Sequence, residues 1–84
     1  MSRAERRAEL LAFLRTIQRP GCALDAVSDD QSLVDAGLID SLATLEIILY
    51  LENSYGLDLA ARGIDPAEID TISGILQVIE RELG

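Results

Sequence analysis

Ser41 lies in the segment Ala-Gly-Leu-Ile-Asp-Ser-Leu of residues 36–42, between an acid and a leucine. Its hydroxyl could attack a substrate, or it could receive a group that another enzyme attaches. A catalytic serine needs a base to accept its proton, and the chain contains neither histidine nor lysine. The sequence therefore predicts no catalytic residue, and we expect the protein not to be an enzyme.

Metal and phosphate-loop chemistry is not indicated either. The chain has one cysteine, no histidine and no close group of acids with ligand spacing, so we expect no metal site. It also has no glycine-rich phosphate loop. Cys22 has no histidine or lysine to activate its thiol, and we interpret it as a small apolar filler.

Two roles remain for Ser41 at the start of a predicted helix. Asp40 or Ser41 could act only as the N-cap, because both residue types are favoured there. Alternatively, the free backbone N–H groups and the positive end of the helix dipole favour an anion such as a phosphate. A serine that is modified by another enzyme needs no catalytic power of its own.

Residues 41–55 carry more apolar side chains than one buried helix face can hold. A step of 100° per residue separates them into two stripes. The stripe expected to face the core contains Thr44, Ile47, Ile48, Leu51 and Tyr55. The second stripe contains Leu42, Leu45 and Leu49, flanked by Glu46 and Glu52. We predict that this second stripe stays exposed and docks partners, with the two glutamates steering them.

The rest of the chain predicts an all-α protein. A capping box of Ser2 and Glu5 opens a first helix, and Arg19-Pro20-Gly21 ends it. Its core residues recur at helical spacing: Leu10, Leu14 and Ile17. A long loop follows over residues 21–40, and its leucines can hold it against the helices.

Two helical segments complete the prediction. Asp65 can cap a short helix with Pro66 at its first position. The last helix begins near Ile72, runs to Gly84 and has a core face of Ile72, Ile75, Leu76 and Ile79. We expect a single domain over residues 1–84: a small four-helix bundle of three longer helices and one short helix, with a long first loop.

Charge points to the kind of partner. The net charge is −8, and every base is an arginine. Between Gly21 and Ala61 there is no positive charge, while eight acids fall there: Asp25, Asp29, Asp30, Asp35, Asp40, Glu46, Glu52 and Asp58. We therefore expect basic partners, and neither nucleic acid nor membrane. Glu9 and Arg15 interrupt the first apolar stretch, so we predict neither a signal peptide nor a spanning helix. We also expect the protein to be cytoplasmic and monomeric.

Residues 37–59 resemble the acyl carrier proteins of fatty acid, polyketide and related assembly systems. The resemblance rests on the Asp40-Ser41-Leu42 triplet, on Gly37 before it, on Glu46 after it and on the aromatic-glycine end of the helix. The helix order, the long first loop and the segment of residues 64–76 are also similar to the carrier fold.

The resemblance implies a prosthetic group and a set of partners. In that family a phosphopantetheinyl transferase moves 4′-phosphopantetheine from coenzyme A onto the serine, and the thiol of the arm carries cargo as a thioester. Ser41 would be the attachment site, Asp40 would position its hydroxyl and the metal of the transferase, and Leu42 would complete the motif. The other implied partners are an acyl- or aminoacyl-loading ligase and synthase or transferase enzymes with basic docking surfaces.

The cargo stays open between alternatives. The first is an acyl intermediate of fatty acid, polyketide or related secondary-metabolite biosynthesis, although Ala43 stands where fatty-acid carriers often have an acid. The second is an aminoacyl group of the D-alanyl or peptidyl type, to whose carriers Gly-Leu-Ile-Asp-Ser is similar. A long acyl chain would need a cleft, which could be lined by Leu45, Ile48, Leu59, Ile64 and Ile69. A third alternative is a helical interaction domain without a prosthetic group.

Overall fold

A computed structural model of the chain describes residues 2–21, 24 and 27–83, without the side chain of Ala60. Cys22, Asp25 and Gly84, which figure in the predictions above, lie outside the described residues. The described elements are α1 (Arg3–Ile17), α2 (Ala43–Tyr55), α3 (Leu59–Arg62), the 3₁₀ turn η2 (Pro66–Ile69) and α4 (Ile72–Leu83), and no strand occurs among them. The prediction of an all-α protein is confirmed.

The first helix has the predicted N-cap, although the Glu5 carboxylate binds the Ser2 hydroxyl instead of the Ser2 N–H that a capping box uses. Ser2 is its N-cap: the serine hydroxyl oxygen accepts a hydrogen bond from the Glu5 N–H at 3.2 Å and donates one to the Glu5 carboxylate, also at 3.2 Å. Leu10 and Leu14 are fully buried, and Ile17 packs against the same core. The helix ends at Ile17, before the Arg19-Pro20-Gly21 segment.

The predicted four-helix bundle needs a correction. Three longer helices are present, but the predicted short helix after Asp65 is only the single 3₁₀ turn η2, and a further single turn, α3, precedes it. Gly63, with a φ of +69° in the left-handed region, follows α3 and separates the two turns. The predicted cap is correct, because Asp65 Oδ1 accepts a hydrogen bond from the Ala67 N–H at 2.9 Å.

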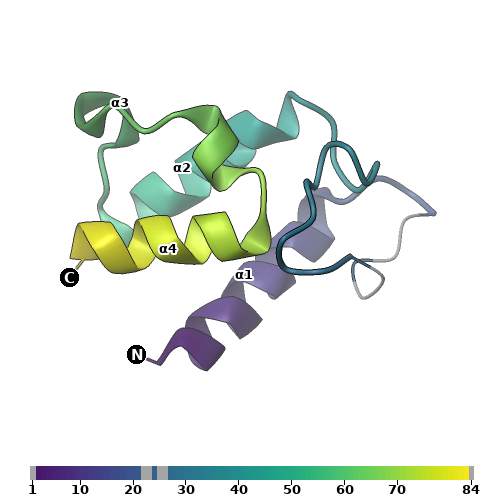
Figure 1. Cartoon of the computed structure of the whole chain (residues 1–84), viewed down its shortest axis with the longest axis horizontal. Coiled ribbons are helices and arrows are strands. Elements are labelled where there is room, and N and C mark those ends of the chain that lie inside the picture. Colours follow the sequence, from purple (N-terminus) through teal and green to yellow (C-terminus); the bar gives the residue numbers. More distant parts are fainter. Residues whose placement is uncertain (1, 22–23, 25–26, 84) are drawn as a thin grey trace.

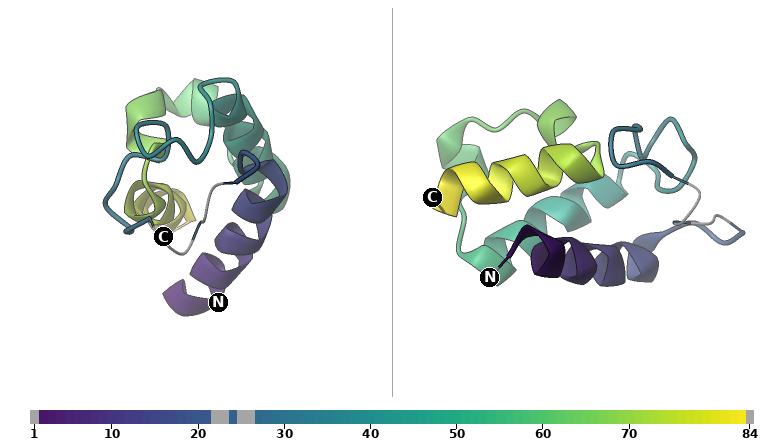
Figure 2. Two further views of the ribbon diagram at one scale, coloured as in Figure 1. Left: turned by 90° about the vertical axis from the view of Figure 1, so that its right-hand side faces the viewer. Right: turned by 60° about the horizontal axis from the view of Figure 1, so that its bottom comes forward.

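The last helix, α4, is central to the packing. It contacts α1, α2 and η2, and it lies between α1 and the α3–η2 segment in two views (Figure 1; Figure 2, right). Its predicted core face is confirmed, since all its members are at most 1% exposed: Ile72, Ile75, Leu76 and Ile79. The described residues contain no helix that is long and apolar enough to cross a membrane.

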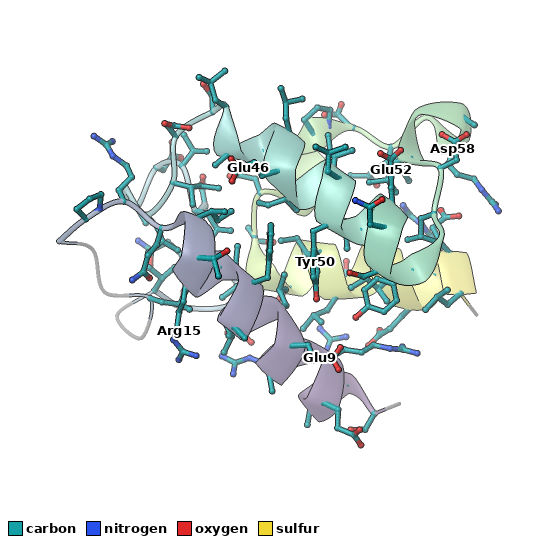
Figure 3. The ribbon with its side chains drawn as sticks, turned by 180° about the vertical axis from the view of Figure 1, so that it is seen from behind. Glu9, Arg15, Glu46, Tyr50, Glu52 and Asp58 are labelled. Carbon is teal, nitrogen blue, oxygen red and sulfur yellow. The ribbon has the colours of Figure 1, made fainter. Side chains whose placement is uncertain are left out.

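Aromatic side chains join α1 to α2. Phe13 stacks on Tyr50 with ring centroids 4.2 Å apart, and Tyr50 meets Tyr55 edge to face at 6.3 Å. Figure 3 shows Tyr50 pointing from α2 toward α1. Burial, together with the neighbouring Tyr55, raises the pKa of Tyr50 to about 12. The two helices are therefore fixed to each other by a neutral, partly buried aromatic contact.

The long first loop is held to the helices by apolar anchors, as predicted. Leu24, Leu33 and Leu38 are at most 4% exposed, and Val27 packs against the core. Ile39 is also buried, at 1% exposed, although the sequence pattern did not place it in the core. Leu38 and Ile39 bring the chain into contact with the core directly before Asp40 and Ser41.

Candidate functional site

Ser41 is exposed two residues before the start of α2. Asp40 and Leu42 on either side of it are also exposed, Leu42 by 72%. Among the residues that the structure describes, no group forms a hydrogen bond with the Ser41 hydroxyl. The side chain is thus accessible to a large partner and has its hydroxyl available for reaction.

Asp40, not Ser41, caps the start of α2. Asp40 Oδ1 accepts a hydrogen bond from the Ala43 N–H at 3.0 Å, and the Asp40 carbonyl oxygen accepts from the same N–H at 3.1 Å. The regular helix begins at Ala43, two residues later than predicted, and residues 41 and 42 form the turn that leads into it. Because the acid takes the capping role, the serine hydroxyl is left free.

The backbone before the site is fixed from two sides. The Leu38 N–H donates to the Leu33 carbonyl oxygen at 3.1 Å, and the Leu38 carbonyl oxygen accepts from the Arg19 N–H at 2.7 Å. Gly37, with a φ of +76°, makes the turn that precedes Leu38 and that a side chain would strain. The end of α1 and the loop therefore determine together where Ser41 emerges.

Other serines stand in different settings. The Ser32 hydroxyl donates to the Asp70 carboxylate and accepts from the Asp35 N–H at 3.2 Å. Ser54 lies near the end of α2, and Ser73 lies within α4 and is partly buried. Ser41 is the residue of these four that follows an acid at a helix start.

The outer face of α2 is apolar next to Ser41. Leu42, Leu45 and Leu49 are exposed by 72%, 59% and 56%. On the opposite face Ile47 and Leu51 are fully buried, and Ile48 and Tyr55 are partly buried against the core. The predicted core face is thus confirmed for these four residues, whereas Thr44 is only partly buried. An exposed group of large apolar side chains is typical of a contact surface. We call Leu42, Leu45 and Leu49 the leucine face.

Acids border the leucine face. Glu46 is exposed and Glu52 is partly buried. Figure 3 shows Glu46 nearer the start of α2 and Glu52 nearer its end. The outer face of α2 thus presents apolar side chains beside acids, and its role in docking stays a prediction.

The residues named for an acyl cleft do not enclose a pocket. In the described part of the chain no pocket is found. Leu59 and Ile69 are 3% and 1% exposed within the core, whereas Leu45 points to the surface. Nor do the described residues contain a group of histidine, cysteine or acidic side chains that could hold a metal ion.

The chain is similar to a known family and to named carrier proteins. Residues 16–79 match the family described as the phosphopantetheine attachment site. The D-alanyl carrier protein of Lacticaseibacillus rhamnosus is 33% identical over 52 residues, which cover 62% of this chain and 64% of that protein. The D-alanyl carrier protein of Streptococcus pyogenes serotype M5 is 33% identical over 51 residues, covering 61% and 65%. The chain thus spans slightly less than two thirds of the length of these relatives.

No solved structure matches the chain. The family match nevertheless covers more than half of the sequence. It begins at the end of α1 and includes most of α4. The chain therefore belongs to the phosphopantetheine attachment site family, whose members are non-catalytic carriers that bear a covalently attached 4′-phosphopantetheine and are used by other enzymes.

Proposed function

We propose that Ser41 bears the 4′-phosphopantetheine group. The observation that carries the proposal is that the Ser41 hydroxyl is exposed and forms no hydrogen bond with any described residue. It lies two residues before the start of the 13-residue helix α2. The positive end of this helix favours the phosphate through which the group is attached. When bound, the group supplies a thiol that holds cargo as a thioester.

Asp40 has two tasks in this proposal. Its Oδ1 atom holds the first turn of α2 through the Ala43 N–H, which fixes the backbone on both sides of Ser41. Its exposed carboxylate makes no hydrogen bond to the Ser41 hydroxyl in the free protein, and its second task is to contact the metal of the phosphopantetheinyl transferase when that enzyme docks. Leu42 follows as the first apolar contact of that enzyme.

The leucine face is the proposed docking surface for the transferase, the loading ligase and the enzymes that use the cargo. Covering about 50 Å² of one leucine contributes on the order of 1 kcal/mol at about 25 cal/mol per Å². Three such contacts, less the cost of association, give a transient complex. Glu46 and Glu52 raise the encounter rate with basic partners, an effect that salt weakens.

A small aminoacyl group is the cargo we favour over a long acyl chain. The relatives named above are D-alanyl carrier proteins, and Ala43 replaces the acid often found after the triplet in fatty-acid carriers. A long acyl chain would also have to displace Leu59 and Ile69, which are packed in the core. An aminoacyl thioester needs no such displacement, because it can remain in solvent at the end of the arm.

The attachment site is tested by intact mass after incubation with coenzyme A and a broad-specificity phosphopantetheinyl transferase. Wild type should gain one phosphopantetheinyl group, and Ser41→Ala should gain none. Ser54→Ala is the matched control, because Ser54 is exposed on the same helix, and it should be modified like wild type. A modified Ser41→Ala variant, or an unmodified wild type, would contradict the proposal.

The cargo is tested on the modified protein. Incubation with a D-alanine-activating ligase, ATP and D-alanine should add one aminoacyl mass that hydroxylamine removes. A fatty-acyl ligase with a long-chain acid should load the protein much more slowly. If only the fatty-acyl ligase loads it, the acyl alternative is correct. Amide shifts near Ile48, Ile64 and Ile69 would then report whether the chain enters the core.

A further inference from the structure

Asp70 connects the long first loop to the junction of η2 and α4. Its backbone carbonyl oxygen accepts from the Leu33 N–H at 2.8 Å. Its carboxylate accepts from the Val34 N–H at 3.4 Å and from the Ser32 hydroxyl. The Ser32 oxygen in turn accepts from the Asp35 N–H at 3.2 Å. One acid thus holds the segment of residues 32–35 through both its backbone and its side chain.

From Leu33 the hydrogen bonds continue toward Ser41. The Leu33 carbonyl oxygen accepts from the Leu38 N–H at 3.1 Å and from the Ile39 N–H at 3.5 Å. Ile39 is 1% exposed and stands two residues before Ser41. A single backbone turn therefore links the loop segment that Asp70 binds to Ser41. The bond between Asp70 and Ser32 joins residues 38 apart in the sequence.

We propose that Asp70 is a positioning residue for the modification of Ser41. Its carboxylate holds Ser32 and Val34 on either side of Leu33, and it thereby steadies the turn that Leu33 makes with Leu38 and Ile39 and that delivers Ser41 to the start of α2. Asp70 touches none of the reacting atoms. The inference rests on the proposed function, because it assumes that Ser41 is the residue that is modified.

Three substitutions separate this role from general stability. Asp70→Ala removes the acceptor for the Val34 N–H and for the Ser32 hydroxyl and keeps the backbone carbonyl. Asp70→Asn keeps one oxygen for Val34, and its amide can donate to the Ser32 oxygen, so it should rescue the contact. Ile79→Val is the matched control: it removes one methyl group from a fully buried residue of α4 and makes no contact with the loop through a hydrogen bond.

The experiment measures kcat/KM for transferase-catalysed modification at saturating coenzyme A, well below the melting temperature of every variant. Asp70→Ala should lower kcat/KM about 10-fold, because small misplacements of a reacting group are costly. Asp70→Asn and Ile79→Val should remain within about twofold of wild type. Ser32→Ala should give an intermediate loss, and it serves as the second variant if Asp70→Ala does not fold.

Amide hydrogen exchange of the unmodified protein gives a readout without the transferase. The Leu38, Ile39 and Ala43 amides should exchange faster in Asp70→Ala, but not in Ile79→Val. An unchanged rate and unchanged exchange in Asp70→Ala would overturn the positioning role while wild-type modification upholds the proposed function. An equal loss of rate in Ile79→Val would also overturn it. A wild type that is never modified would instead overturn the proposed function.

Discussion

Asp40 and Ser41 have different roles at the candidate site. Asp40 accepts the Ala43 N–H and so satisfies a backbone donor that the start of α2 would otherwise leave free. Ser41 is relieved of the capping role and keeps an exposed hydroxyl. The pair predicts that the structural and the chemical contributions of Asp40 can be separated, because asparagine caps a helix as well as aspartate but carries no charge.

Substitutions of Asp40 make this separation measurable. Asp40→Ala should lower the free energy of unfolding by about 1 kcal/mol, since the cap is lost. Asp40→Asn should leave it nearly unchanged in urea unfolding. Both variants should be modified slowly by the transferase, because both lack the carboxylate. If Asp40→Asn is modified at the wild-type rate, the role of Asp40 is only that of a cap.

At the scale of the element, α2 is a helix with two apolar faces, and the exposed Ser41 lies just before its start. Ile47 and Leu51 pack it against the core. Gly56, with a φ of +67°, ends it in a left-handed cap whose N–H donates to the Glu52 carbonyl oxygen at 3.0 Å. The leucine face takes no part in this packing. Changes to it should therefore affect partners more than folding.

Leu45→Arg tests that division. Leu45 is 59% exposed, so the variant should unfold within about 0.5 kcal/mol of wild type. Its modification by the transferase should nevertheless be slower. Leu83→Arg is the matched control, because Leu83 is 45% exposed on α4 and should tolerate the change in both assays. Unfolding of Leu45→Arg would assign this residue to the core and contradict the docking surface.

The contact of η2 with α4 depends on Gly74. A Cβ atom at this position would lie 2.2 Å from the Glu68 carbonyl oxygen and 2.8 Å from Thr71 Oγ1. In an exposed helix, Gly→Ala stabilises by about 1 kcal/mol. Here we expect Gly74→Ala to lower the melting temperature, because the backbone of η2 must move. Gln77→Ala, at an exposed position of α4, should leave it almost unchanged. A stabilised Gly74→Ala variant would show that the contact is loose.

At the scale of the whole molecule, periodicity in the sequence predicts the three long helices and the exposure of the leucine face. It does not predict how the long loop is held. Ser32 and Asp70 are 38 residues apart, and the Leu33 contact uses backbone groups that any residue possesses. Ile39 also entered no helical pattern. The expected short helix after Asp65 is the single turn η2, and the turn α3 before it, which Gly63 separates from η2, was not expected.

The family match decides between classes that the sequence left open. A helical interaction domain without a prosthetic group is wrong, since the chain belongs to a family that bears 4′-phosphopantetheine. The choice between acyl and aminoacyl cargo remains a proposal, which the loading experiment described above tests.

An ion pair that joins distant parts of the chain makes stability depend on pH. Arg7 on α1 forms a hydrogen-bonded pair with Asp29 in the long loop at 2.7 Å, and the Ser73 N–H of α4 donates to the Asp29 carbonyl oxygen at 2.9 Å. The Arg7 guanidinium holds the pKa of Asp29 below its ordinary value. The stabilisation is therefore present above the unfolded pKa of about 4 and is lost as pH falls through the lower folded pKa.

Arg7→Gln should test this dependence. Both side chains are substantially exposed, so the variant should be less stable than wild type by no more than about 1 kcal/mol at pH 7. The difference in urea midpoint should shrink below about pH 4, as Asp29 becomes protonated in both proteins. Asp29→Asn should show the same convergence. A difference that stays constant down to pH 2 would mean that Arg7 contributes through packing alone.

The position of the leucine face beside Ser41 limits how many enzymes can bind the protein at the same time. If every client enzyme reads the same three leucines next to the same serine, two clients cannot occupy one carrier at once. Binding of the enzymes is then mutually exclusive. The fraction of carrier bound to each enzyme follows the concentration of that enzyme and the residence time of its complex. Ser41→Ala, which keeps the face but cannot be loaded, should accordingly act as a competitive inhibitor of all clients in the same concentration range.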